Sequence, residues 1–318
     1  MGYGAGVTVS AMALSYVGMT GDRMDNGLSY NDNAQLVLGG VLALIVFAIA
    51  LELTLRDFRR ALASPAALAA GLGGQFLVLP ALTFALVWWL PVSPEVGLGM
   101  LLVSCCPGGS LSNLMTRMSL GDTALSVSLT GIASALAVVV LPLNFALWAG
   151  LNPETAERLR DIAIDGRAFM LTLIAILAVP LVLGMLLRAQ RPALALRLAR
   201  PLRRSALAVL LIFIVIGFAR DTAAWVGEIH WTFLIVLVHN GLALGAGYAA
   251  AAALGVVEAQ RRAITLEVGM QNSGLALAII FSFFGGLLPM ALIAAWWGTW
   301  HVISGLLLAR WWMRRPPH

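Results

Sequence analysis

The 318-residue sequence contains no lysine, only two cysteines and few charged residues of any kind. Charged residues make up 11% of the chain and hydrophobic residues 60%, whereas a soluble domain carries about 25% charge. This shortage of charge excludes an ordinary soluble domain. It predicts an all-α membrane protein whose helices cross the bilayer several times.

The two cysteines, Cys105 and Cys106, are adjacent and lie in an apolar stretch. Adjacent thiols rarely reach the geometry of a disulfide, and the chain offers no cysteine spacing typical of a metal site. We therefore expect both to be small packing residues.

All 20 basic residues are arginine, and the formal net charge is +5. A basic balance can indicate nucleic-acid binding, but these arginines stand in short segments between apolar runs. There they act as orientation signals rather than as a phosphate-binding surface. We expect membrane lipid around the protein, no nucleic-acid partner and no obligatory protein partner.

Nine apolar runs are long enough to cross a bilayer at about 20 residues per span. They are joined by short connections, which predicts one membrane domain over residues 34–310 and a tail over 311–318. The runs lie near residues 34–54, 66–90, 95–118, 122–149, 166–187, 203–220, 230–254, 262–284 and 287–310.

Residues 1–33 precede the first of these runs. Residues 1–20 carry no charge but are rich in glycine, serine and threonine. They are compatible with a degenerate tenth helix, a signal-like segment without its basic start, or a mis-assigned start of the chain. The polar residues that follow are expected outside the cell.

The arginines are distributed unevenly between the two sides of the predicted spans. If the first span runs from outside to inside, the outer arginines are Arg23, Arg158, Arg160, Arg167 and Arg220. The inner ones are Arg56, Arg59, Arg60, Arg117, Arg188, Arg191, Arg197, Arg200, Arg203, Arg204, Arg261, Arg262, Arg310, Arg314 and Arg315. This excess predicts an outer N-terminus and a cytoplasmic C-terminus in the cell (inner) membrane.

Two of the predicted spans are interrupted by residues that break a helix. The first break lies in LLVSCCPGGSLSNLM (residues 101–115) and the second in TLEVGMQNSGLA (residues 265–276). Irregular backbone at this depth survives only inside protein or beside a watery cavity. Two such breaks in corresponding places of the two halves of a chain indicate the binding site of a transporter.

In the first break, Pro107 removes a backbone donor, and the two glycines after it tolerate conformations closed to other residues. Ser110 then stands at the expected N-cap of the outgoing half-helix. The positive dipole end of that half-helix suits an anionic substrate group. A simple proline kink remains the alternative interpretation.

In the second break, Glu267 is the only carboxylate well inside an apolar run, since Glu52 lies within a turn of Arg56. A mid-membrane acid costs at least about 2.5 kcal/mol and by default indicates a cation or proton site. Gln271 and Asn272 offer neutral oxygens beside it. A salt bridge to a buried arginine is not expected, because no arginine lies deep in any predicted span.

Further polar residues within the spans are less specific. Ser126 and Thr130 lie four residues apart, on one helical face. Gln75 is an isolated buried amide. His239, Asn240 and His301 could each bond to a neighbouring helix or line a cavity.

The breaks fall in the third and the eighth of the nine predicted spans. Spans one to four and six to nine then correspond as two four-helix units with the broken helix third in each. Because five spans separate corresponding members, the units run in opposite directions. We therefore predict an inverted repeat, with the fifth span as a connector.

The sequences of the two breaks resemble those of the bile acid:sodium symporter family, including its bacterial members, over roughly residues 35–310. The motifs that carry the resemblance are CCPGGSLSNLMTRMSLGDTALSVSLT (105–130), TLEVGMQNSGLALA (265–278), QF (75–76), VHNG (238–241) and WHVISG (300–305). The resemblance implies that two discontinuous helices cross at the centre of a core domain, which packs against a flatter panel domain. The core would comprise about 66–149 and 230–310, and the panel about 34–60 and 166–220.

The resemblance also implies two sodium sites and a substrate cavity beside the crossing. The implied first site comprises Ser112, Asn113, Ser126, Thr130 and Glu267. The implied second site comprises Gln75, Glu267, Val268, Met270 and Gln271. The implied substrate-binding residues are Ser110, Asn272 and His301.

The sequence departs from the family at two points. The family's WHN reads Trp300-His301-Val302 here. The asparagine side chain is absent, which predicts one polar contact fewer to the substrate. The weak N-terminal segment favours nine helices rather than the ten of many bacterial members.

These observations predict a sodium-coupled symporter that imports an organic anion, such as a bile acid or a small carboxylate, by alternating access. Two sodium ions would be its only cofactors. Proton coupling through Glu267 is one alternative, and a sensor that does not transport is another. An intramembrane enzyme is disfavoured, because no G-x-S-x-G, H-E-x-x-H or paired-aspartate motif is present.

Overall fold

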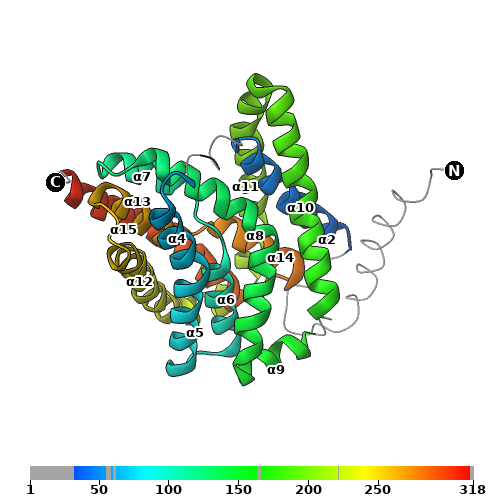
Figure 1. Cartoon of the computed structure of the whole chain (residues 1–318). Helices are drawn as coiled ribbons and strands as arrows, with labels where there is room; N and C mark the ends of the chain where they lie inside the picture. Colours follow the sequence, from blue (N-terminus) through cyan, green and yellow to red (C-terminus); the bar gives the residue numbers. More distant parts are fainter. Residues whose placement is uncertain (1–31, 55–58, 60–61, 163–165, 221, 316–318) are drawn as a thin grey trace.

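The structure is a computed structural model that describes residues 32–54, 59, 62–162, 166–220 and 222–315 (Figure 1). These residues form helices and, at one point, an isolated β-bridge, so the predicted all-helical class is confirmed. The expected N-terminal segment 1–33 lies outside the described residues except for its last two, which begin a helix. Arg23, Arg56 and Arg60 are also outside them.

The first two apolar runs form α2 (Asp32–Ala50) and one long continuous helix. That long helix comprises α4 (Pro65–Gly73), the π-helical turn η1 (Gly74–Val78) and α5 (Leu79–Trp89). Proline at the first turn of α4 is favourable because its missing N–H is not needed there. The π-helical turn was not predicted. Single π turns of this kind often occur at functional sites, because they displace the side chains of one turn.

The first broken helix consists of α6 (Pro94–Cys105) and α7 (Leu111–Met118). α6 begins where the Ser93 side chain accepts a hydrogen bond from the backbone N–H of Val96, and it ends just before Pro107. The sequence therefore predicted both the interruption and its position.

Two further helices follow, α8 (Thr123–Leu151) and α9 (Pro153–Asp161). The Asp122 carboxylate caps α8 by accepting from the backbone N–H of Leu125 at 2.9 Å. The surface helix α9 was expected to be a loop. Its start signals, the Asn152 cap and the proline that follows, can be read in the sequence. The helix was missed because it is polar, and helices were predicted only from apolar runs long enough to cross a bilayer.

The helices α10 (Gly166–Gln190), α11 (Pro192–Arg220) and α12 (Thr222–Ala253) extend beyond the predicted spans. The arginine-rich residues 188–203, expected as a loop, are almost wholly helical. Arginine is a good helix former. Many arginines therefore show that a segment lies outside the membrane interior, but they do not show that the helix ends there.

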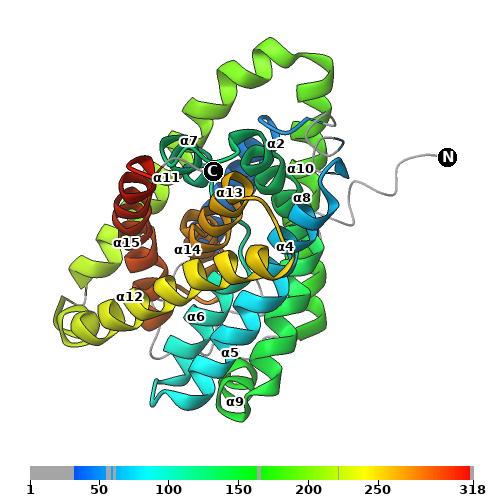
Figure 2. The ribbon, with the colours of Figure 1, turned by 60° about the vertical axis from the view of Figure 1, so that its left-hand side comes forward.

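The second broken helix consists of α13 (Glu258–Gly269) and α14 (Ser273–Phe283), which stand one above the other in Figure 2. α14 is capped by Asn272, whose Oδ1 accepts from the backbone N–H of Leu275 at 3.0 Å. The last helix, α15 (Leu288–Met313), packs against α12, α6 and α14. α2 packs against α10, α11 and α14.

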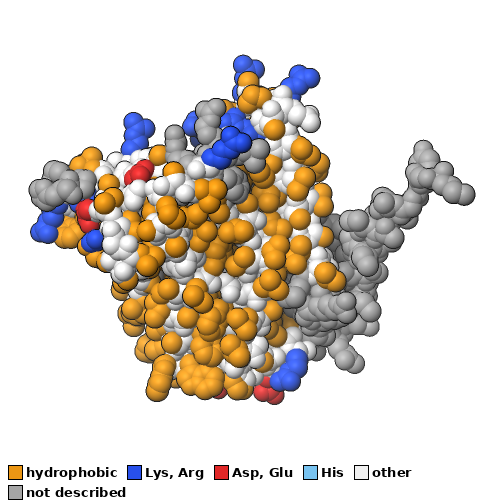
Figure 3. Space-filling model, in the orientation of Figure 1, with side chains coloured by type: hydrophobic (Ala, Val, Ile, Leu, Met, Phe, Trp, Pro, Cys, Tyr) orange, Lys and Arg blue, Asp and Glu red, His pale blue; other side chains and the backbone are white. Residues whose placement is uncertain are grey.

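Five helical segments of the described chain are long and apolar enough to cross a membrane. They span 65–89, 123–151, 171–190, 230–253 and 288–313. The half-helices α6 and α14 are apolar but shorter. Figure 3 shows hydrophobic side chains over the middle of the visible face and arginines mainly at the end that bears α7 and α13. A multi-pass membrane protein is therefore confirmed, whereas the number of nine spans stays a prediction.

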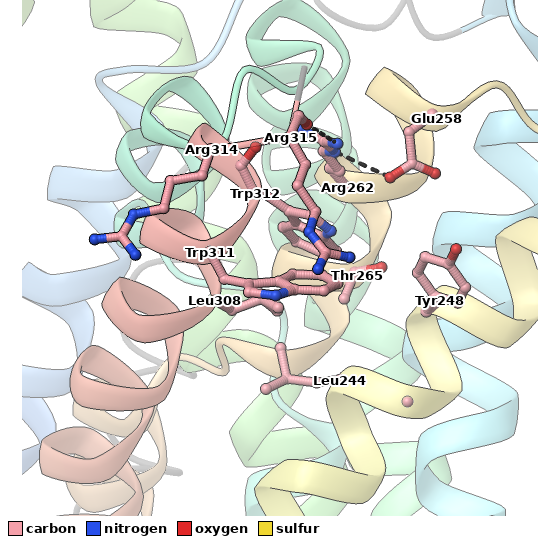
Figure 4. A pocket seen from close by; sticks show the side chains of 11 residues that line it. Leu244, Tyr248, Glu258, Arg262, Thr265, Leu308, Trp311, Trp312, Arg314 and Arg315 are labelled. Carbon is pink, nitrogen blue, oxygen red and sulfur yellow. Dashed lines mark hydrogen bonds and ion pairs between the residues drawn. The ribbon is translucent and has the colours of Figure 1, made fainter. Parts of the chain in front are cut away.

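A buried arginine lies at that end of the molecule, at the first residue of the eighth predicted span. Arg262, in α13, is 3% exposed. It donates to the backbone carbonyls of Ser119 at 2.8 Å, Trp312 at 3.3 Å and Arg315 at 2.6 Å, and it pairs with Glu258 at 3.0 Å (Figure 4). It thus ties α13 to the end of α15 and the turn after α7, beside a cavity of about 950 Å³.

Candidate functional site

The two helix breaks meet and hydrogen-bond to each other. The backbone N–H of Gly109 donates to the Met270 carbonyl at 2.8 Å, and that of Asn272 donates to the Pro107 carbonyl at 2.9 Å. These bonds form an isolated antiparallel bridge between Gly108 and Gln271. Each break thereby provides hydrogen-bond partners for backbone groups that the other has freed from its helix. Irregular backbone is tolerated at this depth when its polar groups are satisfied in this way. The two predicted breaks therefore lie in contact with each other.

The carboxylate of Glu267 lies at this crossing and is the one buried carboxylate among the residues that the structure describes. Its Oε2 accepts hydrogen bonds from Ser112 Oγ at 2.6 Å and Thr130 Oγ1 at 2.7 Å. Its Oε1 is buried and has no hydrogen-bond partner within the described chain. The buried arginine Arg262 does not neutralise it, because that guanidinium pairs with Glu258.

The absence of a side chain at Gly108 makes room for this carboxylate. A Cβ atom built on Gly108 would collide with Oε1 of Glu267, and it would lie 3.1 Å from the backbone oxygen of the same residue. At Gly109, in contrast, a Cβ would meet its nearest atoms at 3.6 Å, an ordinary contact distance. The first of the two glycines is therefore required by the close approach of the second break.

The five residues of the predicted first sodium site are brought together. Around Glu267, Asn113 Oδ1 accepts from Ser126 Oγ at 2.8 Å and from Thr130 Oγ1 at 3.2 Å. Ser112 and Thr130 lie 3.4 Å apart through their hydroxyl oxygens. The half-helix α7 contributes two of these side chains and α8 two more. The spacing of four between Ser126 and Thr130 places both on the face of α8 that turns toward the break.

This donor set fits a sodium ion by its chemistry. Every side chain in it offers an oxygen, the ligand that hard cations prefer. The hydroxyl groups can turn their protons away and present a lone pair instead. The unpartnered Oε1 of Glu267 supplies a negative charge that no described residue neutralises.

The residues of the predicted second site are also close together, but they are joined differently. Gln75 lies in the π-helical turn η1, and its Nε2 donates to the Cys106 carbonyl at 2.7 Å and to Gln271 Oε1 at 2.9 Å. Gln271 Nε2 donates in return to Gln75 Oε1 at 3.2 Å and to the Val268 carbonyl at 2.6 Å. The Met270 carbonyl accepts the bond from Gly109 that closes the crossing.

The three predicted substrate residues line one cavity of about 700 Å³ beside the crossing. Asn272 uses its carbonyl oxygen to cap α14, so its amide NH₂ is the group that could face a ligand. His301 is 5% exposed, and its Nδ1 is buried without a partner in the described part of the chain. Thr130 and Asn113 of the first oxygen group line the same cavity.

Val302, where the family sequence has a polar residue, does not line this cavity. It packs instead against a cluster that includes Met115, Leu266 and Met270. The predicted loss of a substrate contact at this position is therefore not supported by the geometry. Successive helical residues point about 100° apart, so a neighbour of a lining residue such as His301 commonly faces elsewhere.

Two polar residues with open roles in the sequence bond to neighbouring helices. Asn240 Nδ2 donates to the Gly269 carbonyl at 2.7 Å, and Ser304 Oγ donates to Asn240 Oδ1 at 2.6 Å. The carbonyl at the end of α13 is thereby satisfied. His239 lies 2.7 Å from Thr83 through Nε2 and packs edge-on against Trp297. Asn240 of VHNG and Ser304 of WHVISG thus support the second break.

Two features were missed in the sequence. Thr116 donates to Ser126 at 3.2 Å and extends the first oxygen group. Glu52 pairs with Arg203 of α11 at 3.2 Å. The second pairing joins residues 151 apart, so no local pattern could have revealed it.

Membrane helices that include two broken ones, meeting at a buried carboxylate, are features of a transporter. The comparisons agree. The model of the Sodium Bile acid symporter family matches residues 40–227, more than half of the chain. A "sodium-dependent transporter YocS" of Bacillus subtilis, described as uncharacterized, is 32% identical over 281 residues, which cover 86% of this chain and 82% of that protein.

Two eukaryotic relatives are similar as well. The "Probable sodium/metabolite cotransporter BASS1, chloroplastic" of Arabidopsis thaliana is 30% identical, with 87% of this chain and 66% of the relative covered. The human "P3 protein" is 28% identical over 68% of this chain and 44% of its own length. The chain therefore belongs to the sodium bile acid symporter family. It is a sodium-coupled membrane transporter of a small molecule, and not an enzyme.

Proposed function

We propose that the protein imports an organic anion together with two sodium ions by alternating access. The observation that carries this proposal is the buried carboxylate of Glu267, whose Oε1 has no partner within the described chain. A bare charge at mid-membrane costs at least about 2.5 kcal/mol. A bound cation would offset that cost, and so its arrival would change the stability of the whole crossing.

The first sodium ion would bind among Ser112, Asn113, Ser126, Thr130 and Glu267. In the structure, the two hydroxyls nearest to the carboxylate donate their protons to it. On sodium binding we expect both to rotate and to accept instead. The helices α7 and α8 would then be held to α13 by the ion rather than by hydrogen bonds.

The second sodium ion would bind to Gln75, Glu267, Val268, Met270 and Gln271. The amide of Gln75 must release Gln271 for its oxygen to turn toward an ion. Backbone carbonyls have two lone pairs, so those of Val268 and Met270 can keep their present bonds and still contribute. Glu267 would be shared by both sites and would couple them electrostatically.

The substrate would bind in the cavity on the other side of the crossing, at Ser110, Asn272 and His301. Glu267 is negative until sodium neutralises it, so an anion in the neighbouring cavity would be repelled before sodium binds and tolerated afterwards. Sodium and anion would then raise each other's affinity, because such a linkage is reciprocal.

We propose that transport follows from a relative movement of two parts, a core and a panel, each built from pieces of both units of the proposed inverted repeat. The core would comprise residues 66–149 and 230–310, and the panel 34–60 and 166–220. The cavity has walls from both, since Ile45 and Leu207 line it together with the breaks. Moving the crossing against the panel would close the cavity on one side and open it on the other.

The orientation proposed from the arginines places the C-terminus in the cytoplasm and the loop with α9 outside. Figure 3 supports it, since most arginines lie at one end of the molecule. Cysteines introduced at the exposed Glu157 of α9 and the exposed Ala193 at the start of α11 would test it. An impermeant maleimide added to intact cells should label the first and spare the second, and the reverse pattern would overturn the proposed orientation.

The direct test of function is thermal unfolding of the purified protein in sodium chloride and in potassium chloride at equal ionic strength, with a panel of organic anions. We expect sodium to raise the unfolding temperature and a binding anion to raise it further only in sodium. Proteoliposomes should then accumulate that anion when a sodium gradient is imposed. Uptake driven by a pH gradient without sodium would instead support proton coupling through Glu267.

A further inference from the structure

The substrate cavity has two charged side chains in its lining, Glu52 from the turn after α2 and Arg203 from α11, both opposite the crossing. The cavity is otherwise lined by apolar side chains, neutral polar groups and the backbone of the breaks. A single cation in such a lining is the natural partner for an anion. It was not among the expected substrate residues.

The cavity-facing sides of α2 and α11 have matching patterns. On α11 the lining residues are Arg203, Leu207, Leu210 and Leu211, and along α2 and its end they are Ile45, Ile49, Glu52 and Leu53. Both sets follow the spacing i, i+4, i+7, i+8. On α11 this spacing is one face of a helix, whereas Glu52 and Leu53 lie just past the end of α2. Each set of apolar residues therefore includes one charged residue, and the two charged side chains have opposite signs and pair with each other.

One nitrogen of Arg203 serves two partners. Nη1 lies 3.2 Å from Glu52 Oε2 and 3.1 Å from Ser110 Oγ. Charge-assisted bonds of arginine to carboxylates are typically about 2.7–2.9 Å and often bidentate, so this pairing is loose. The two side chains are 28% and 34% exposed, and ion pairs of such exposure add little stability. Stability alone therefore does not account for a charge pair in this cavity.

We propose that Arg203 binds the charged group of the substrate, a carboxylate attached to an apolar body, and that Glu52 occupies the guanidinium until the substrate arrives. This inference rests on the proposed function and specifies its ligand. The planar guanidinium matches a carboxylate in two-point geometry. The carboxylate of Glu52 already occupies one of its nitrogens, and the two sets of apolar residues would receive the body.

The same contact connects the ligand to the movement of the protein. Ser110 belongs to the break, whereas Arg203 belongs to α11 on the opposite wall. A carboxylate held between them would bridge the two walls, and it would have to be released when they separate. Arg203 would thus determine both which anion binds and in which state it is held.

The test uses the full-length protein in sodium chloride and four probes. These are 4-methylpentanoate, its uncharged amide, glycocholate, and taurocholate, which has the same steroid body with a sulfonate. Affinity is measured by titrating the unfolding temperature. We expect a carboxylate to bind the wild type, the amide to bind at least about tenfold more weakly, and taurocholate more weakly than glycocholate.

Substitutions of Arg203 and Glu52 are expected to change carboxylate affinity in opposite directions. Arg203→Gln should weaken carboxylate binding by about tenfold or more, since a charged hydrogen bond is lost, and Arg203→Lys should restore part of it. Glu52→Gln should tighten binding by about threefold or more, because the competing anion is gone. Arg204→Gln is the matched control: it removes the same charge from the next position, whose side chain is exposed, and should change affinity less than about twofold.

Sodium binding without any anion is measured in the same variants. It should be unchanged, which shows that they are folded and separates this inference from the proposed function. Loss of sodium response in the wild type would contradict the proposed function. A sodium-responsive wild type that binds no carboxylate, or an Arg203→Gln variant that behaves like Arg204→Gln, would overturn the inference. A Glu52→Gln variant that weakens binding as much as Arg203→Gln would also overturn it.

Discussion

The two oxygen-rich groups at the crossing differ in how far their polar atoms are already satisfied. In the first, the Glu267 carboxylate has one oxygen without a partner in the described chain, and its other contacts are to hydroxyls that can rotate. In the second, the amides of Gln75 and Gln271 bond to each other and to backbone carbonyls. A cation can enter the first group if the hydroxyl protons reorient. To enter the second group, it must first break hydrogen bonds between the two glutamine side chains.

This difference predicts an order of binding. The first group is arranged for a cation and should bind sodium more tightly. The second should fill afterwards, once the charge that the two groups share has been partly neutralised and the amides have separated. The variants below are expected to separate the two groups, and they are given from the largest effect to the smallest.

The largest effect is expected for Glu267→Gln, which removes the charge that both groups share. Sodium-dependent stabilisation and uptake should be lost. In sodium-free buffer, however, the variant should be more stable than the wild type, because burying the bare carboxylate costs about 2.5–3.5 kcal/mol. Thermal unfolding with and without sodium measures both. Glu154→Gln on the surface helix α9 is the control, and sodium-driven uptake by the Glu267 variant would refute the model.

Gly108→Ala should have the next largest effect. The added Cβ would collide with the Glu267 carboxylate, so we expect a loss of about 1–3 kcal/mol in stability and a clear loss of sodium affinity. Gly109→Ala is the matched control, because its Cβ would meet only ordinary contacts. Equal behaviour of the two variants in sodium titrations would mean that the carboxylate does not need this space.

Gln75→Ala should impair the second group alone. It leaves the buried amide of Gln271 with fewer partners, which costs about 1–3 kcal/mol of stability. Sodium should still stabilise the protein, but with a shallower concentration dependence. Asn144→Ala is a suitable control, because that side chain bonds to the Phe76 carbonyl of the same π-helical turn at 2.7 Å but offers no ligand to either ion group. Complete loss of the sodium response in Gln75→Ala would show that the groups do not bind separately.

The smallest effect is expected for Thr116→Val. Thr116 contacts Ser126 rather than the carboxylate, so sodium affinity should fall by less than about threefold, the scale of one neutral hydrogen bond. Thr130→Val removes a direct bond to Glu267 and should cost more. If the two variants rank in the reverse order in sodium titrations, the first group is centred elsewhere.

The sequence predicted the two breaks well because their signals are local. Pro107 and the adjacent glycines cannot continue a helix, and the four-residue spacing of Ser126 and Thr130 fixes a common face without tertiary information. The isolated acid at Glu267 was equally clear from the apolar residues around it.

Other features depend on which surfaces pack together, and the sequence carried no signal for them. Nothing local distinguishes Arg203, which faces the cavity, from its exposed neighbour Arg204. Arg262 was expected at the inner end of the eighth span, and its burial depends on backbone carbonyls at the end of α15 and in the turn after α7. The π-helical turn at Gln75 likewise depends on its neighbours.

The bonds of Arg262 have a consequence for the order in which the protein is made. Two of its carbonyl partners belong to Trp312 and Arg315, which the ribosome adds about fifty residues after it. Until then this guanidinium lacks the groups that make its burial favourable, so the end of the chain completes the folding of α13. We expect a stop codon after Arg310 to leave a nascent transporter that is inserted but degraded, although every residue of both sodium groups has been synthesised.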